Sequence, residues 1–123
     1  MRLRPVAGLV SPRAFLVSLG RDAMRLPTFR SIVGTRTYRV PAAANHRAHV
    51  WSNLNLLLGH YVGATGIKTG FTTAAGNCLL FAATRGGKEL IGVVLDSSPV
   101  DSPAGMGAAS SDATAMLNWG FSR

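Results

Sequence analysis

The chain has 123 residues, of which 47% are hydrophobic and 15% are charged. This composition excludes a disordered chain, and the length favours a single domain, residues 1–123, with one core. The single cysteine, Cys78, excludes an internal disulfide and a cysteine-based zinc site. No apolar run reaches the roughly 20 residues of a membrane helix, and no segment has the pattern of a signal peptide.

Positive charge is concentrated in the first half of the chain. Lysine and arginine number 13 against five acidic residues, a formal net charge of +8. Residues 1–61 hold nine arginines and one acid, Asp22. A basic half is a feature of proteins that bind nucleic acid or anionic membranes. These arginines are spaced singly, which favours an ordinary solvated surface. A non-enzymatic basic module that binds nucleic acid or anionic surfaces is nevertheless one candidate function, kept as the alternative to the enzymatic one described below.

The first predicted element is an amphipathic helix over residues 12–26. Ser11-Pro12 is a typical helix start, a capping hydroxyl followed by proline at the first helical position. Apolar residues then recur at helical spacing and are expected to pack on the core, and Pro27 ends the pattern. These apolar residues are Phe15, Leu16, Leu19, Ala23 and Leu26.

The middle of the chain gives weaker signals. Residues 35–40 alternate enough to predict a short strand, and residues 41–48 are expected to form a loop. The apolar segment over residues 51–58 has no period that assigns it to a helix or to a strand.

Two apolar, β-rich runs follow, residues 76–85 and 88–96. Gly86-Gly87 separates them, so the sequence predicts an antiparallel hairpin. Both faces of both strands are apolar, and such a hairpin needs cover on both sides, usually from helices. The expected fold class is therefore α/β (α+β), an antiparallel sheet with helices on both faces.

The last part of the chain predicts a loop and a helix. Residues 97–107 are rich in serine, proline and glycine and are expected to form the loop. A helix is expected over residues 108–120, with Trp119 and Phe121 as large anchors. Its apolar stripe consists of Ala109, Ala113, Met116, Leu117 and Gly120.

The residues best suited to chemistry lie just before the hairpin. A strand over residues 65–71 is expected to pair antiparallel with it and contains Lys68-Thr69-Gly70. An exposed strand end offers backbone groups to an extended peptide. Lys68 adds positive charge, the Thr69 hydroxyl can hydrogen-bond a terminal carboxylate, and Gly70 lets another backbone approach closely.

The context of Lys-Thr-Gly is more specific than the triplet itself. A small-residue turn, two apolar strands and a helix that ends with residues 117–121 follow it. This pattern resembles the serine-type D-alanyl-D-alanine carboxypeptidases, the low-molecular-mass penicillin-binding proteins. The likeness extends from about Ser11 to Phe121 and includes Ser11-Pro12, Pro27-Thr28-Phe29, Val33-Gly34-Thr35 and Asn53-Leu54-Asn55-Leu56-Leu57.

The resemblance implies a partial β-lactamase/transpeptidase-like domain that acts on peptidoglycan stem peptides ending in D-Ala-D-Ala and binds β-lactams. It implies catalytic roles for Lys68, Thr69, Gly70 and Phe71, whose backbone N–H forms half of an oxyanion hole. It implies substrate contacts from Lys68, Thr69, Gly70 and Thr72. No cofactor, no metal and no nucleic-acid partner is expected, and the implied location is extracytoplasmic, in the periplasm or cell envelope.

Two motifs of that family are not in this sequence. The nucleophile comes from Ser-x-x-Lys and a second wall from Ser-x-Asn. Thr65 and Arg85 stand three residues before the two lysines, Lys68 and Lys88, and no asparagine has serine two positions earlier. In the family both motifs lie upstream of the matched segments. The chain is therefore expected to be the C-terminal part of a catalytic domain, inactive without the missing N-terminal half.

Four other side chains that could carry chemistry are expected to have only structural roles, and one further position differs from the family pattern. His46 and His49 have no carboxylate or cysteine nearby and are expected to be loop residues rather than metal ligands. His60 has no nucleophile pattern beside it, and Cys78 is expected to be a core residue in mid-strand. At the position of Leu54, some family members carry a polar or basic residue that helps to bind the substrate carboxylate. Leucine cannot make this secondary contact.

Overall fold

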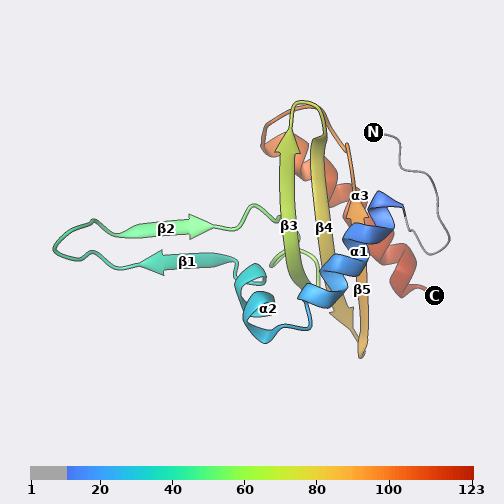
Figure 1. The fold of residues 1–123 in the computed structure, drawn as a ribbon, viewed down its shortest axis with the longest axis horizontal. Coiled ribbons are helices and arrows are strands. Elements are labelled where there is room, and N and C mark those ends of the chain that lie inside the picture. Colours follow the sequence, from blue (N-terminus) through green and yellow to red (C-terminus); the bar gives the residue numbers. More distant parts are fainter. Residues whose placement is uncertain (1–10) are drawn as a thin grey trace.

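A computed structural model of the chain describes residues 11–123, which form three helices and two antiparallel sheets. Figure 1 shows a sheet with helices on both sides and a long hairpin that projects from it. In chain order the elements are α1 (Pro12–Ala23), α2 (Pro27–Val33), β1 (Thr37–Val40), β2 (His49–Ser52), β3 (Ala64–Thr72), β4 (Gly76–Arg85), β5 (Lys88–Val94) and α3 (Pro103–Phe121).

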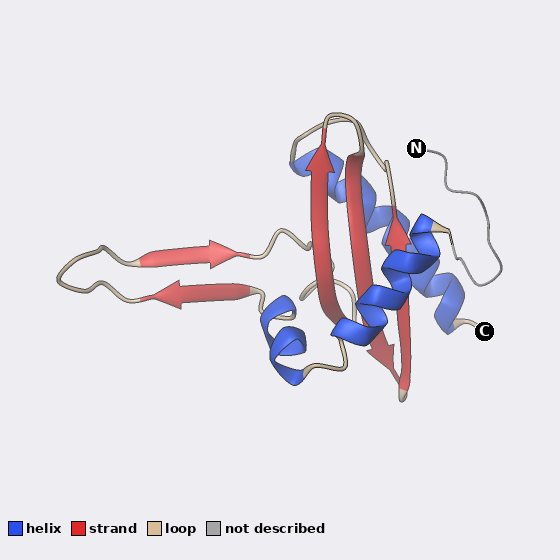
Figure 2. Ribbon diagram, viewed as in Figure 1, coloured by secondary structure: helices blue, strands red, loops and turns tan. Residues whose placement is uncertain are grey.

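The main sheet has the strand order β3-β4-β5, and each neighbouring pair is antiparallel. The predicted hairpin and its neighbour strand are therefore adjacent, as the sequence indicates. Thr69 pairs with Leu79, and Gly70 pairs with Cys78. Helices α1 and α2 pack on one face and α3 on the other, so the predicted α/β (α+β) fold class is confirmed (Figure 2).

Two hydrophobic clusters hold these layers together, one on each face of the sheet. The larger lies between β4 and α3, and the smaller lies beneath α1 and α2. Burial of this apolar surface is the main stabilising term for the fold. The larger cluster consists of Leu57, Tyr61, Leu79, Phe81, Ala83, Ala109, Ala113 and Leu117, and the smaller of Met24, Ile67 and Ala82.

The second sheet is a two-stranded arm, β1 paired with β2, that extends away from the main sheet (Figure 1). Aromatic rings stack along it: the Tyr38 and Trp51 ring centroids are 6.4 Å apart, and those of His49 and Trp51 are 5.2 Å apart. Strand β2 lies partly in the segment that had no assignment from sequence. The predicted loop over residues 41–48 connects the two strands.

The first predicted helix is shorter than expected and is followed by a second one. Helix α1 ends at Ala23, and α2 begins at Pro27. Pro27 stops the first helix and starts the next, because proline fits the first helical turn. The prediction of which face of α1 is buried is also wrong. Phe15 and Leu19 are 59% and 54% exposed, and Gly20 lies against the sheet instead.

The last helix is longer than expected and begins at Pro103, inside the predicted loop. The Ser102 hydroxyl caps it by accepting from the Gly105 N–H at 3.2 Å. This is the same Ser-Pro start that marks α1, here hidden among residues typical of loops. Phe121 packs against the larger cluster as predicted, but Trp119 is 63% exposed and does not anchor the helix.

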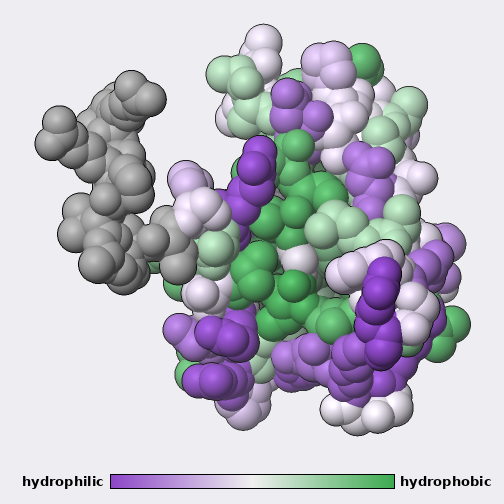
Figure 3. Space-filling view, turned by 90° about the vertical axis from the view of Figure 1, so that its right-hand side faces the viewer, coloured by the Kyte–Doolittle hydropathy of each residue, from purple (hydrophilic) through white to green (hydrophobic). Residues whose placement is uncertain are grey.

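Hydrophobic residues gather on the face that looks onto β5 (Figure 3). An apolar groove of about 420 Å³ lies there between β5 and α3, with Leu90, Ile91, Met116 and Trp119 in its walls. Within the described residues, no helix has the length and apolarity needed to cross a membrane.

Candidate functional site

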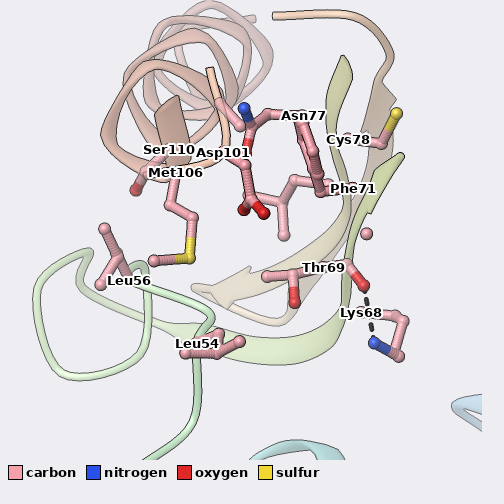
Figure 4. Close-up of a pocket in the computed structure, with 13 residues that line it drawn as sticks. Leu54, Leu56, Lys68, Thr69, Phe71, Asn77, Cys78, Asp101, Met106 and Ser110 are labelled. Atoms are coloured by element: carbon pink, nitrogen blue, oxygen red, sulfur yellow. Dashed lines mark hydrogen bonds between the residues drawn. The ribbon is translucent and has the colours of Figure 1, made fainter. Parts of the chain in front are cut away.

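A cavity of about 220 Å³ lies beside the Lys-Thr-Gly segment of β3. Its walls come from β3, the start of β4, the loop before β3 and the start of α3 (Figure 4). The lining residues are Leu54, Leu56, Lys68, Thr69, Gly70, Phe71, Asn77, Cys78, Leu79, Asp101, Met106, Ala109 and Ser110.

Strand β3 presents one backbone edge that has no partner strand among residues 11–123. The Thr69 side chain points into the cavity, whereas the Lys68 ammonium turns back and donates to the Thr69 carbonyl at 2.6 Å (Figure 4). The Thr69 hydroxyl has no hydrogen-bond partner in the described part of the chain. A Cβ at Gly70 would meet no atom within 4 Å, so the surface beside this residue is open. The strand thus offers backbone groups, a hydroxyl and a cation to an extended ligand.

The loop before β3 is fixed by its two asparagines. The Asn53 amide donates to the Thr35 carbonyl at 3.1 Å, and its oxygen accepts from the Asn55 N–H at 2.9 Å. The Asn55 oxygen in turn accepts from the Leu57 N–H at 3.1 Å. Such side-chain turns are typical of asparagine. They hold Leu57 in the core and leave the neighbouring leucine, Leu56, in the cavity wall.

Asn77, at the start of β4, holds the loop that leads to α3. Its side-chain amide donates to the carbonyls of Ser98 and Val100, at 2.9 Å and 2.7 Å. The side chain is 3% exposed, so these bonds are sheltered from water. They place Asp101, the next residue, at the cavity rim.

Four of the five residues singled out from the sequence lie together in the cavity wall: Lys68, Thr69, Gly70 and Phe71. Thr72 is outside the wall, and its hydroxyl accepts from the Ala75 N–H in the turn after β3. Cys78 is expected from the sequence to be a core residue, but in the structure it is only half-buried.

Several lining residues were not anticipated from the sequence. Leu56, Asn77, Asp101 and Met106 belong to segments that only the folded chain brings to β3. The sequence offers one signal for them: Leu54, which differs from the family pattern at a position that contacts the substrate carboxylate in some relatives, lies in the same loop before β3 as Leu56.

His46 lies in the loop of the arm, as expected, and His60 is exposed. The loop prediction is wrong for His49, which is half-buried and is the first residue of β2; its ring centroid is 6.0 Å from that of His46. Within residues 11–123, no group of three or more histidine, cysteine or acidic side chains could hold a metal ion.

Lys-Thr-Gly is one of the motifs shared by penicillin-binding proteins and class A β-lactamases, and here it lies on an open strand edge beside a cavity. The family model described as D-alanyl-D-alanine carboxypeptidase matches residues 9–99. The chain therefore belongs to the D-alanyl-D-alanine carboxypeptidase family, whose members are serine-type hydrolases.

Individual relatives agree with this assignment. A D-alanyl-D-alanine carboxypeptidase of Streptomyces sp. (strain K15) is 40% identical over 119 residues, which cover 94% of this chain and 38% of the relative. One from Mycobacterium tuberculosis is 32% identical over 111 residues, which cover 86% of this chain and 35% of the relative. The chain thus spans little more than a third of the length of these curated relatives.

Solved structures show the same fold. The crystal structure of the Streptomyces K15 DD-transpeptidase has a TM-score of 0.78 at 40% identity, over 90% of this chain and 42% of that one. The D-alanyl-D-alanine carboxypeptidase from Mycobacterium tuberculosis has a TM-score of 0.67 at 29% identity, over 94% of this chain and 45% of that one. The expected likeness to the family is confirmed over most of the chain.

Proposed function

We propose that this chain supplies the substrate-docking strand of a serine-type D-alanyl-D-alanine carboxypeptidase whose nucleophile lies on a segment outside this sequence. The observation that carries the proposal is the place of Lys68-Thr69-Gly70, on an open strand edge in the wall of a cavity. The substrate is a peptidoglycan stem peptide that ends in D-Ala-D-Ala.

The peptide docks by adding a strand to the free edge of β3, where backbone groups bind it whatever its side chains are. Gly70 supports this, because no side chain fills the space beside it. The Thr69 hydroxyl donates to the terminal carboxylate, and Lys68 attracts that carboxylate electrostatically. Thr72 lies just outside the cavity wall and its hydroxyl accepts from the Ala75 N–H, but the hydroxyl proton remains able to donate to the substrate as a further polar contact.

The chemical step requires groups that this sequence does not contain. In a serine-type mechanism the hydroxyl oxygen of a serine attacks the carbonyl carbon of the D-Ala-D-Ala peptide bond, and the terminal D-alanine leaves with a proton on its amine. Water then hydrolyses the acyl-enzyme and regenerates the serine. The Phe71 N–H contributes half of the oxyanion hole for both steps. Without Ser-x-x-Lys the isolated chain is inactive.

The same pocket accepts β-lactams, which carry a carboxylate and a strained amide in place of the peptide. A substrate in the cell wall requires an extracytoplasmic location, in the periplasm or cell envelope. The alternative, a basic module for nucleic acid or anionic surfaces, rests on charge alone. The family match over residues 9–99 does not favour it.

A nuclear magnetic resonance titration of the ¹⁵N-labelled chain tests the docking step. The ligand is Nα,Nε-diacetyl-L-lysyl-D-alanyl-D-alanine, compared with the same peptide amidated at its C-terminus. We expect shifts at residues 68–72 with the free acid and about tenfold weaker binding of the amide, since a hydrogen bond to a charged group is worth more than a neutral one. Equal binding of acid and amide, or shifts confined to other segments, would overturn the proposal.

A further inference from the structure

A second cavity, of about 310 Å³, lies at the base of the arm, where β1 begins and β2 ends (Figure 1). Its walls come from these two strand ends and from the loop that leads to β3. Among residues 11–123, Leu56 is the one lining residue that it shares with the cavity beside the Lys-Thr-Gly segment. This arm-base cavity therefore has polar groups of its own.

The side-chain amide of Asn55 is a buried polar group in the wall of the arm-base cavity. The residue is 2% exposed, and its side-chain oxygen accepts from the Leu57 N–H at 3.1 Å. That bond fixes which end of the amide is the nitrogen. The nitrogen has no hydrogen-bond partner among residues 11–123. Because a buried donor is costly to leave unpaired, this N–H₂ group favours an acceptor atom in the cavity.

The cation of the same wall is Arg36, and the loop before β3 holds it in place. Its guanidinium lies across Gly59, where a Cβ would be only 2.6 Å from Nη1. Gly59 has a φ of +76°, which glycine adopts without strain, so the close approach depends on this residue. The Arg36 carbonyl also accepts from the Asn53 N–H at 2.8 Å. Although Arg36 is exposed, its charged group packs on the loop.

No acidic residue lines the arm-base cavity within the described part of the chain, and the Arg36 guanidinium has no ion-pair partner there. The other polar side chains in the wall include the Thr37 and Ser52 hydroxyls and the His60 ring, all of which can donate. A cation and several N–H and O–H donors, without a carboxylate, match an oxyanion. The formal net charge of +8 favours the approach of such a ligand.

We propose that the arm-base cavity binds an oxyanion, the phosphate ester or carboxylate group of a small molecule, through Arg36, Asn55 and His60. The guanidinium supplies the charge, and the buried Asn55 N–H₂ supplies a donor that is sheltered from water. A cavity of about 310 Å³ has room for the rest of a small ligand beside the anionic group. The inference does not depend on the docking of a peptide to β3.

The experiment is a nuclear magnetic resonance titration of the ¹⁵N-labelled 123-residue chain. The probes are sodium phosphate and sodium acetate, each compared with sodium chloride at the same ionic strength, which keeps general screening constant. We expect saturable shifts of the Asn55 side-chain N–H₂ and of the backbone amides of residues 36, 37, 59 and 60 with phosphate, acetate or both, and none with chloride. The tighter of the two anions identifies the group that the site prefers.

Two variants separate the cavity from general positive charge. Arg36→Gln should weaken binding of the preferred anion about five- to tenfold, between the values for an exposed ion pair and for a hydrogen bond to a charged group. Arg39→Gln removes the same charge from an exposed residue of β1 outside the cavity wall and should leave the affinity unchanged.

Three results would overturn the oxyanion site: shifts that do not saturate with either anion, shifts confined to residues 68–72 around Lys68, and equal weakening by the two arginine variants. None of them bears on the docking strand, whose test uses a peptide ligand and its amide.

Discussion

Lys68 and Thr69 are neighbours in β3, yet the fold prepares them differently. The Thr69 hydroxyl already faces the cavity, whereas the Lys68 ammonium must leave the Thr69 carbonyl to reach a ligand (Figure 4). The lysine is exposed, so this rearrangement costs little. Both residues are therefore available to a peptide carboxylate, one as a fixed hydroxyl and one as a mobile charge.

Their contributions can be measured in a chimaeric enzyme in which residues 11–121 replace the matching segment of the Streptomyces relative. Thr69→Val keeps the shape and removes the hydroxyl, and Lys68→Ala removes the charge. Each should lower kcat/KM for a peptide ending in D-Ala-D-Ala by about ten- to a hundredfold, the value of roughly 1.5–3 kcal/mol for a hydrogen bond to a charged group.

The matched control for these variants is Lys88→Ala, which removes the lysine that begins β5 and donates to the Gly120 carbonyl at 2.9 Å. It should leave kcat/KM unchanged. C-terminally amidated substrates should show little difference between the parent and either β3 variant. If both β3 variants hydrolyse the free acid as fast as the parent, the assigned docking role is wrong.

At the scale of the element, strong local patterns were predictable and tertiary effects were not. The Gly86-Gly87 turn and the two apolar strands beside it follow from sequence, because a two-residue glycine turn fixes the register of a hairpin. The buried face of α1 does not follow from it. Periodicity marks Phe15 and Leu19 as the packing face, but Gly20 lets the helix approach the side chains of Ile67 and Leu80 on the sheet.

The contrast between local patterns, which can be predicted, and tertiary contacts, which cannot, also applies to the site. Lys68 to Phe71 could be found from the sequence because they form one contiguous motif on one strand. Asp101 could not, because its place depends on the two long-range hydrogen bonds that Asn77 makes to the loop before it. A single asparagine at a strand start carries no signal for contacts more than 20 residues away.

Two glycines of α3 test how closely this helix meets the loop at the cavity. At Gly105 a Cβ would collide with the Val100 carbonyl oxygen and the Asn77 amide, whereas at Gly107 it would meet nothing within 4 Å. Gly105→Ala should therefore lower the free energy of unfolding by about 1–3 kcal/mol. Gly107→Ala should raise it by about 0.5–1 kcal/mol, because alanine favours a helix.

Urea denaturation monitored by circular dichroism gives both values from the transition midpoint and slope. Similar stability of the two variants would mean that the start of α3 does not pack against the loop as described. The comparison is direct because both substitutions add the same methyl group to the same helix.

For the whole molecule, the charge distribution favours a module that binds anionic partners, whereas the family assignment favours a carboxypeptidase. The family assignment is the stronger evidence. Nine arginines in residues 1–61 are compatible with many anionic partners. The relatives at 40% and 32% identity are carboxypeptidases, and they match nearly the whole chain. Net charge governs solubility and nonspecific association, so it carries less weight than a specific arrangement of residues.

The central claim is that this chain provides one wall of a carboxypeptidase site and that the nucleophile comes from elsewhere. Covalent labelling by a fluorescent penicillin, applied side by side to the chain alone and to the folded chimaera, tests it most directly. We expect labelling of the chimaera and none of the chain, because removal of the nucleophile removes covalent catalysis. Labelling of the isolated chain, or a chimaera that has native circular dichroism and remains unlabelled, would contradict the account.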